Sequence, residues 1–386
     1  MSASDQMASY PIAADYVVVG SGLTGAVIAR LLADAGRDVL VVDRRSHLGG
    51  NVHDAAGDGG IRVHTYGPHY FRTNSEPVWR FVSRFADFYR YEAVLASYVD
   101  GRHERWPVAA EYIRRTVGEG WQPAFSGTPA NFEEASLAMM PESVYRSFVK
   151  GYTEKQWGVP AAALSAELAG RFEVRADDDP RLKRHRHQGI PVGGYAKLMR
   201  GMLDGLPVQL GRDYLEERSS FRWRRALVFT GPIDEYFGFS LGRLHYRGQE
   251  RSHTYLPDVA RHQPFGQVNN PDPGAGPHVR TIEWTHLLSE EERARVRGTL
   301  LTRETPKTPT DPDEYEYPFP DDANKSLYRR YRNEANAVPG LLVCGRLGEY
   351  RYYDMDQAIA RAMLLAKRLL ADDRRISPPA ALSGKR

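Results

Sequence analysis

The sequence contains little cysteine and little net charge. Cys344 is the single cysteine among 386 residues, so no disulfide can form within the chain. It lies in the apolar run 341–344, which predicts a small buried core thiol rather than a nucleophile. The formal net charge is only +3, so no global field favours nucleic acid as a partner.

Long hydrophobic runs and metal-binding clusters are also missing. No apolar stretch approaches the roughly 18 residues of a membrane span. Residues 1–10 are polar and lack the apolar core of a signal peptide, so we expect a cytoplasmic protein. His185 and His187 are surrounded by cationic side chains, which argues against a bound metal ion. The sequence therefore predicts neither a membrane anchor nor a metal site.

The strongest motif lies in the stretch 16–51. An apolar run at 17–19 predicts a buried parallel strand. Gly20, Gly22 and Gly25 follow it with GxGxxG spacing, where the strand should give way to a helix. The first glycine allows a tight turn, the second lets the backbone approach a pyrophosphate, and the third lets the helix pack on the strand. The helix N-terminus would then offer N–H groups to the phosphates.

The end of the same stretch narrows the choice of cofactor. A second buried strand at 39–42 ends in Asp43, near the spacing of about 20 residues expected for a carboxylate that binds ribose hydroxyls. Gly49, Gly50 and Asn51 resemble the run in FAD enzymes of the glutathione-reductase class, where the chain passes the pyrophosphate again. We therefore expect bound FAD rather than loosely held NAD. The alternative is an ordinary βαβ unit with a glycine turn.

The rest of the chain predicts an α/β protein with a discontinuous Rossmann-like FAD-binding domain, an inserted helical domain and an antiparallel sheet domain. The predicted FAD-binding domain comprises 12–77, 205–240 and 336–372. The predicted helical domain is 78–190, with a mobile substrate flap at about 168–187. The predicted sheet domain is 191–204 and 241–335, and 1–11 and 373–386 are tails. A last helix at 357–370 would aim its N-terminus at the flavin and favour an anionic reduced ring.

Four further motifs carry a family resemblance. They are Gly-Tyr-Thr-Glu-Lys-Gln-Trp-Gly at 151–158, Gln-Gly-Ile-Pro-Val-Gly-Gly-Tyr at 188–195, Thr-Gly-Pro-Ile-Asp at 230–234, and Gly-Arg-Leu at 345–347 with Tyr-Tyr-Asp-Met at 352–355. From about residue 16 to residue 370, the chain resembles the UDP-galactopyranose mutases.

The resemblance implies an isomerase that uses reduced FAD (FADH⁻) without net redox change. In that family, flavin N5 attacks the anomeric carbon of UDP-galactopyranose and UDP leaves. The sugar ring then opens and recloses as the furanose, and UDP returns. The resemblance further implies NAD(P)H or a reductase that primes the flavin, and a homodimer.

The resemblance also assigns the site residues. It places Arg171 and Arg280 on the diphosphate as catalytic groups. The residues assigned to the substrate are Phe148, Tyr152, Trp157, Asn270, Tyr317, Tyr352, Asp354, Arg72 and Arg105. Those assigned to the cofactor are Gly20, Gly22, Leu23, Thr24, Gly25, Asp43, Arg44, Gly50, Asn51, Gly231, Gly345, Arg346 and Met355.

Five positions depart from the family pattern, mostly near the sugar. Arg72 replaces a histidine, Arg105 an asparagine and Leu182 a flap tyrosine. His278 replaces a tyrosine of a Tyr-Thr-Arg triplet, and Glu316 replaces one of a tyrosine pair. We therefore hypothesise a sugar other than galactose, such as one with different substituents or with a carboxylate attracted by Arg72 and Arg105.

Three alternative functions stay open from the sequence. One is the same mutase chemistry on another nucleotide sugar, such as dTDP-fucose. The second is a redox flavoenzyme on the same cofactor fold, which would have no need of Arg171 and Arg280 together. The third is a non-catalytic nucleotide-sugar binder that has lost the ring contraction.

Overall fold

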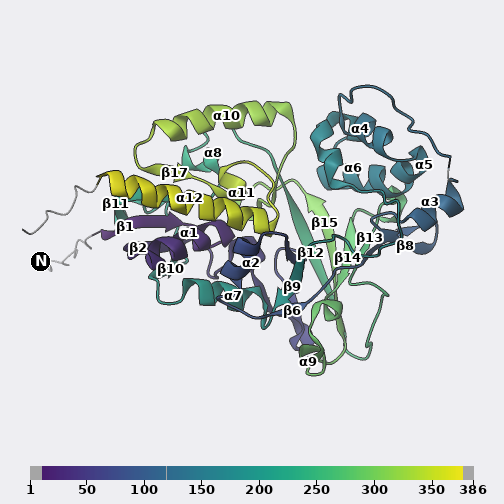
Figure 1. Cartoon of the computed structure of the whole chain (residues 1–386), viewed down its shortest axis with the longest axis horizontal. Helices are drawn as coiled ribbons and strands as arrows, with labels where there is room; N and C mark the ends of the chain where they lie inside the picture. The colour runs from purple at the N-terminus through teal and green to yellow at the C-terminus, as the bar shows by residue number, and fades with distance from the viewer. Residues whose placement is uncertain (1–10, 119, 377–386) are drawn as a thin grey trace, which may run out of the picture.

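The computed structural model describes residues 11–118 and 120–376, without the side chains of 171 and 373–376. Residues 1–10 and 377–386 of the predicted tails lie outside this part. Figure 1 shows a parallel sheet with long helices at one end of the molecule, a second sheet in the middle and a group of short helices at the other end.

A five-stranded parallel sheet has the strand order β10-β2-β1-β11-β17. Its strands are β1 (Ile12–Val19), β2 (Val39–Asp43), β10 (Val208–Leu210), β11 (Phe221–Phe229) and β17 (Leu341–Val343). They come from three distant parts of the chain, which fall within the segments 12–77, 205–240 and 336–372. The buried parallel strands predicted at 17–19 and 39–42 are both present.

Both faces of this sheet are covered, which explains why its strands are apolar throughout. Val18 and Val41 belong to a core shared with the long helices, whereas Val17 and Leu40 belong to a second core on the opposite face. Cys344 is buried, as predicted, and burial raises the pKa of its thiol. The thiol therefore stays protonated at neutral pH.

Six helices accompany the sheet and its connections. They are α1 (Leu23–Asp34), α7 (Gly194–Leu203), α8 (Ile233–Tyr236), α10 (Asp322–Ala337), α11 (Gly345–Gly348) and α12 (Met355–Ile376). The helices α1 and α12 lie side by side on the sheet although they stand at opposite ends of the chain (Figure 1). The helix predicted at 357–370 is six residues longer at its C-terminal end than expected.

A seven-stranded sheet forms the middle of the molecule, with the order β16-β12-β15-β14-β13-β7-β8. Its strands are β7 (Leu95–Val99), β8 (Arg102–Trp106), β12 (Tyr246–Leu256), β13 (Gln267–Asn269), β14 (Arg280–Glu283), β15 (Thr299–Lys307) and β16 (Tyr317–Pro318). The pairing of β13 with β7 is parallel, and the other pairings are antiparallel.

The segment 78–190, predicted to be a helical domain, contains strands near its start. The strand β6 (Phe88–Arg90) precedes the hairpin of β7 and β8, which adds two strands to the seven-stranded sheet. Asp100 and Gly101 connect the hairpin with φ angles of 51° and 77°. An Asp-Gly pair is a strong signal for such a two-residue turn.

Two small sheets complete the strands. The strands β5 (Phe71–Thr73) and β6 pair with β9 (His187–Pro191), so β9 returns the chain from the flap to the cofactor side. The strands β3 (Asp54–Ala56) and β4 (Arg62–His64) form a hairpin. The turn at 57–60 lies between them.

Short helices form the far end of the molecule (Figure 1). They are α3 (Ala110–Thr116), α4 (Phe132–Met139), α5 (Glu142–Val144) and α6 (Gly151–Trp157), with a π-helical turn (Tyr145–Lys150) that makes 142–157 one continuous run. The other helices are α2 (Glu76–Val82) and α9 (Glu290–Arg293). Ser75 caps α2, because its side chain accepts from the Val78 N–H.

The length and apolar character of the helices decide whether one of them could span a membrane. Within 11–118 and 120–376, no helix combines the length and the apolar character needed to cross a bilayer.

Gly25 allows α1 to sit directly on the glycine turn. A Cβ at this position would lie 2.0 Å from the carbonyl oxygen of Gly20 and 3.2 Å from a methyl group of Val18. We predict that Gly25→Ala lowers the free energy of unfolding by about 2–3 kcal/mol, because the helix must move off the strand. Denaturant unfolding measures this. Gly170→Ala is the control, since no atom lies within 4 Å of its Cβ position. Equal stability of the two variants would contradict the prediction.

Candidate active site

The first cavity lies at the carboxyl ends of β1, β2, β11 and β17, where open α/β sheets bind their ligands. Its volume is about 320 Å³. The structure brings all but one of the predicted cofactor residues to its wall: Gly20, Gly22, Leu23, Thr24, Asp43, Arg44, Gly50, Asn51, Gly231, Gly345, Arg346 and Met355. Gly25 is the exception, because it packs beneath the turn.

Glycines keep the floor of this cavity free of side chains. Gly20 has φ +100°, and a Cβ there would collide with Thr230 Oγ1. Gly22 bridges to Gly49, and the Gly49 N–H donates to the Ser21 carbonyl at 3.1 Å. A dinucleotide can therefore approach the backbone closely both at the glycine turn of 20–25 and at 49–51, as the sequence predicted.

Asp43 is already oriented by backbone groups. Its Oδ2 accepts from the Ser21 N–H at 2.7 Å and from Ser21 Oγ at 2.6 Å, and its Oδ1 accepts from the Arg45 N–H at 2.9 Å. These bonds fix the carboxylate at the end of β2, where it borders the cavity. Ser21 is not among the predicted residues, because it stands at a variable position of GxGxxG.

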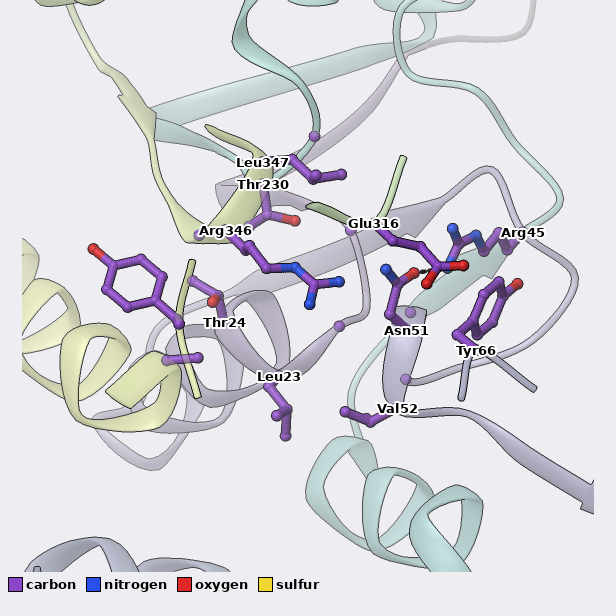
Figure 2. A pocket seen from close by; sticks show the side chains of 18 of the residues that line it. Leu23, Thr24, Arg45, Asn51, Val52, Tyr66, Thr230, Glu316, Arg346 and Leu347 are labelled. Carbon is purple, nitrogen blue, oxygen red and sulfur yellow. Dashed lines mark hydrogen bonds between the residues drawn. The ribbon is translucent and has the colours of Figure 1, made fainter. Parts of the chain in front are cut away.

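Arginines form the wall near Asp43. Arg44 pairs with Glu235 at 2.7 Å and with Asp213 at 3.4 Å. These ion pairs join three segments of the chain at the wall of the cavity. Arg45 donates to Asn51 Oδ1 at 2.8 Å and lies over the Tyr66 ring at 4.4 Å, as Figure 2 shows.

Two nitrogen groups in this cavity have no hydrogen-bond or ion-pair partner within the described residues. The Arg346 guanidinium points into the cavity (Figure 2) and makes no ion pair or hydrogen bond with the described chain. His69 Nδ1 is shielded from solvent and likewise lacks a partner there. Burial, with the nearby Arg346 charge, lowers the pKa of His69 to about 3, so the imidazole is neutral at pH 7. Both groups fit a polar, anionic cofactor.

A second cavity of about 260 Å³ opens between the seven-stranded sheet, α6 and the flap. The two cavities share Pro68, Tyr70, Arg72, Arg280, Tyr317 and Tyr352. A ligand in the second cavity therefore reaches the ligand of the first at this junction.

Aromatic residues assigned to the substrate do line the second cavity. Phe148, Tyr152 and Trp157 border it, although Phe148 and Trp157 are also more than nine-tenths buried in the core of the helical end. Tyr317 and Tyr352 stack with ring centroids 6.2 Å apart at the junction. Burial raises the pKa of Tyr317 to about 12, so its hydroxyl stays a hydrogen-bond donor.

Arg280 is held by buried carboxylates. Its Nε donates to Glu304, and Glu304 also pairs with Arg251 at 2.9 Å. Arg251 pairs with Glu316 at 2.7 Å, so two arginines and two glutamates alternate. Burial disfavours the charged forms, but the opposite charges outweigh it: they raise the pKa of Arg280 and lower that of Glu304. Arg280 therefore presents a fixed positive charge to both cavities.

Arg72 and Asp354 form an ion pair at the junction of the two cavities. Arg72 Nη2 lies 3.2 Å from Asp354 Oδ2, and both residues border the first cavity. The Arg72 Nε is buried and has no partner among the described residues.

Other assigned residues do not reach the cavities, or cannot be placed. Arg105 is exposed and donates to the Asp178 carbonyl at 3.2 Å. The Asn270 amide donates to the carbonyls of Ala275 and His278. Neither residue borders a cavity, whereas their neighbours Trp106 and Asn269 do. The carboxylate-binding pair of Arg72 and Arg105 is therefore not assembled. The Arg171 side chain lies outside the described part.

Of the other three positions that depart from the family pattern, two border a cavity and one does not. Leu182 borders the second cavity and Glu316 the first. His278 borders neither, and its carbonyl accepts from Lys155 Nζ at 3.0 Å.

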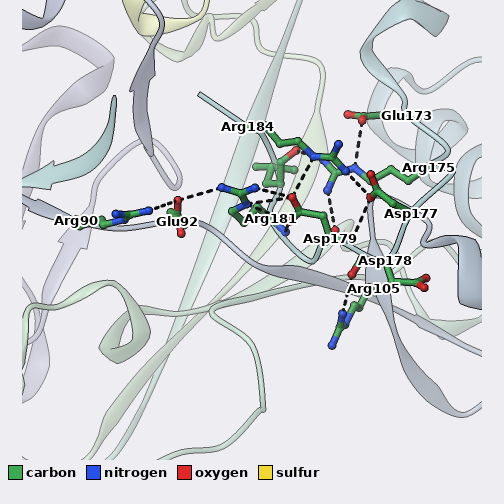
Figure 3. A network of polar contacts seen from close by, with 11 residues as sticks. Arg90, Glu92, Arg105, Glu173, Arg175, Asp177, Asp178, Asp179, Arg181 and Arg184 are labelled. Carbon is green, nitrogen blue, oxygen red and sulfur yellow. Dashed lines mark hydrogen bonds and ion pairs between the residues drawn. The ribbon is translucent and has the colours of Figure 1, made fainter. Parts of the chain in front are cut away.

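The flap is fastened to the body by a network of ion pairs (Figure 3). Arg175 is buried beneath it and donates to the carbonyls of Asp179 and Leu182. Arg181 pairs with Asp179 at 2.6 Å and reaches Glu92 at 3.4 Å. Most of these pairs are partly exposed, so each contributes little and the network can open at modest cost.

The sequence analysis missed several polar residues that line the second cavity: Thr153, Gln156, Gln267 and Asn269. Thr153 and Gln156 stand in the motif at 151–158 and could have been found by their position. Gln267 and Asn269 alternate on a short strand, a pattern too brief to stand out.

The parallel sheet, the glycine turn and the adjoining second cavity define a protein with a flavin-type dinucleotide-binding domain. An NAD(P)-binding Rossmann-like domain matches residues 18–85, and the UDP-galactopyranose mutase family matches residues 147–352. The chain belongs to the UDP-galactopyranose mutase family. This confirms the predicted family and fold class.

Individual relatives agree along the whole chain. A probable UDP-galactopyranose mutase of Klebsiella pneumoniae is 30% identical, over 92% of this chain and 94% of that protein. The dTDP-fucopyranose mutase of Escherichia coli is 31% identical, over 91% and 97%. A crystal structure of reduced UDP-galactopyranose mutase superposes with a TM-score of 0.71 at 15% identity, covering 93% of this chain and 94% of that one. Putrescine oxidase shares the fold with a TM-score of 0.58 at 14% identity, over 93% and 99%.

Glu304 carries a prediction about the buried charges. We expect Glu304→Leu to lower the free energy of unfolding by about 3–5 kcal/mol, because it leaves the buried Arg280 guanidinium without a counter-charge and removes one of the two carboxylates that face Arg251. Denaturant unfolding measures this. Glu250→Leu is the matched control, an exposed glutamate on the same sheet, and should change stability by at most about 0.5 kcal/mol. A loss below about 1 kcal/mol in Glu304→Leu would contradict the prediction.

Proposed function

We propose that this protein is an FAD-dependent isomerase that interconverts the pyranose and furanose forms of a nucleotide sugar, with UDP-galactose as the first substrate to test. The observation that carries the proposal is the junction of the two cavities at Arg280. A buried guanidinium there can hold a diphosphate while the attached sugar faces the cofactor.

The cofactor proposed is FAD in its reduced form. The glycine turn with the N-terminus of α1 would hold the pyrophosphate, Asp43 the ribose, and the N-terminus of α12 the pyrimidine end of the flavin. Reduced flavin supplies the nucleophile at N5 and carries the bond exchange that the side chains cannot perform. The neutral His69 and the unpaired Arg346 are suited to its polar edges and phosphates.

The protein's own contribution is to position the substrate and stabilise the leaving group. Departure of UDP builds negative charge on the diphosphate, and Arg280 is already fixed to receive it. We assign Arg171 to the same task from the flap, and Tyr317 and Tyr352 to hydrogen bonds with the phosphates. Phe148, Tyr152 and Trp157 would enclose the uracil. The flap covers this cavity and would exclude water during the exchange.

One feature supports a different nucleotide sugar as the substrate. Arg72 and Asp354 form an ion pair at the sugar end, and a dTDP-fucopyranose mutase is among the relatives. The same chemistry on a dTDP-sugar or another modified sugar is therefore the second candidate.

The partners proposed are NAD(P)H or a reductase that primes the flavin, and a second copy of the chain in a homodimer. We propose a cytoplasmic location, where nucleotide sugars and NAD(P)H are both available.

The first experiment is turnover by dithionite-reduced, FAD-loaded protein on UDP-galactose, dTDP-fucose and other UDP- and dTDP-sugars, with products identified by NMR. Furanose formation with catalytic reductant supports the proposal. Reductant or oxygen consumed in proportion to product would instead identify a redox flavoenzyme. Absence of any furanose product across the panel would overturn the proposal.

Removal of the central guanidinium provides a mutational test. We expect Arg280→Ala to lower kcat at least about 100-fold, since the leaving diphosphate loses its fixed donor, while bound FAD stays near wild-type stoichiometry. Absorbance at the flavin band and NMR turnover measure the two effects. Arg303→Ala is the control, an exposed arginine on the adjacent strand, and should keep full activity. Activity of Arg280→Ala within a few-fold of wild type would remove this assignment.

A further inference from the structure

Building on the proposed function, we propose that Asn269 is a specificity-determining residue that contacts a hydroxyl group of the sugar. The assignment rests on a short chain of side-chain hydrogen bonds that ends at Asn269 in the second cavity. Asn269, the last residue of β13, would take the substrate-binding role that the sequence had assigned to Asn270.

The hydrogen-bond chain links three residues in one direction. Tyr70 O–H donates to Gln267 Oε1 at 3.3 Å, and Gln267 Nε2 donates to Asn269 Oδ1 at 2.8 Å. The Asn269 NH₂ group then donates to no protein atom in the described part of the chain. All three residues border the second cavity.

Asn269 is enclosed, but its NH₂ group stays open to the second cavity. Only 5% of Gln267 and 7% of Asn269 are exposed, and Asn269 Nδ2 is not sealed inside the protein. An amide edge that faces a cavity from such an enclosed residue is suited to a hydrogen bond with a ligand. A sugar hydroxyl suits either edge of the amide, because it can accept from the NH₂ group or donate to the carbonyl.

The sheet register places Asn269 beside the diphosphate donor. Asn269 pairs with Arg280 across β13 and β14, and Arg280 pairs with Glu304 across β14 and β15. Residues directly opposite one another share a face of the sheet, with Cβ atoms about 5 Å apart. The amide therefore reaches the group attached directly to the diphosphate.

Tyr70, at the other end of this hydrogen-bond chain, indicates which side of the diphosphate Asn269 contacts. Tyr70 borders both cavities, so these hydrogen bonds run from the junction of the two cavities to Asn269, which lies beside Arg280. Gln267 and Asn269 line only the second cavity, as do the aromatic side chains of 148–157 that would hold the base, so the bond to Tyr70 sets the direction. In the proposed function the sugar lies between the diphosphate and the cofactor, on the Tyr70 side of Arg280, and Asn269 would meet its hydroxyl groups.

Asn270 provides a matched comparison one residue away. It is equally buried at 7% exposed, but its amide is bonded to the carbonyls of its own loop. Loss of this side chain would disturb the loop and affect nucleotide and nucleotide-sugar binding alike.

The test compares UDP with UDP-galactose in the FAD-loaded protein, by calorimetric titration. In Asn269→Leu, which keeps the side-chain volume, we expect the Kd of UDP-galactose to rise about tenfold while the Kd of UDP stays within twofold. Asn270→Leu should change both Kd values by the same factor. Equal weakening of both ligands in Asn269→Leu, or no weakening, would overturn the inference.

Deoxygenated substrates test the same contact without relying on a variant that must fold. UDP-galactose analogues that each lack one sugar hydroxyl are titrated into the wild-type protein. One analogue should bind about tenfold more weakly than UDP-galactose, and this difference should vanish in Asn269→Leu. A difference that persists in Asn269→Leu for every analogue would overturn the assignment of Asn269. Absence of both UDP and UDP-galactose binding in wild type would overturn the proposed function as well.

Discussion

The buried row of alternating charges on the seven-stranded sheet is the interaction on which the site depends. Arg251, Glu304 and Arg280 stand opposite one another on three adjacent strands, and Glu316 closes the row beside Arg251. Charges removed from water are tolerated only when they are paired with good geometry. The row therefore fixes the register of the strands and aims Arg280 before any ligand arrives, which is what a preorganised anion site requires.

The backbone lies close to this row of charges at a glycine. Gly67 passes over it, and a Cβ there would lie 2.7 Å from Glu304 Oε1. The same turn leads to Pro68 and His69 at the first cavity. The electrostatics of the second cavity and the shape of the first are thus built from the same few residues.

Local patterns carried most of what the sequence could predict. The stretch 16–51 contains strand, turn, helix and carboxylate in order, so the cofactor edge was predictable residue by residue. Arg105 and Asn270 border neither cavity, whereas their neighbours Trp106 and Asn269 border the second. Successive side chains of β8 point to opposite faces, which separates Arg105 from Trp106. Asn270 lies just beyond β13, and its amide is bonded within its own loop. The hairpin at 95–106 was missed because it is short and lies among helices.

The parallel sheet has a consequence for how the protein is made. The strand β17 adds the edge next to β11, and Gly345 and Arg346 follow it directly. During synthesis, about nine-tenths of the chain must leave the ribosome before this edge is covered. Until then β11 exposes an unpaired edge, a feature that promotes association between chains. The wall of the first cavity is therefore complete only late in synthesis, so a dinucleotide cofactor would be loaded among the last events of biogenesis.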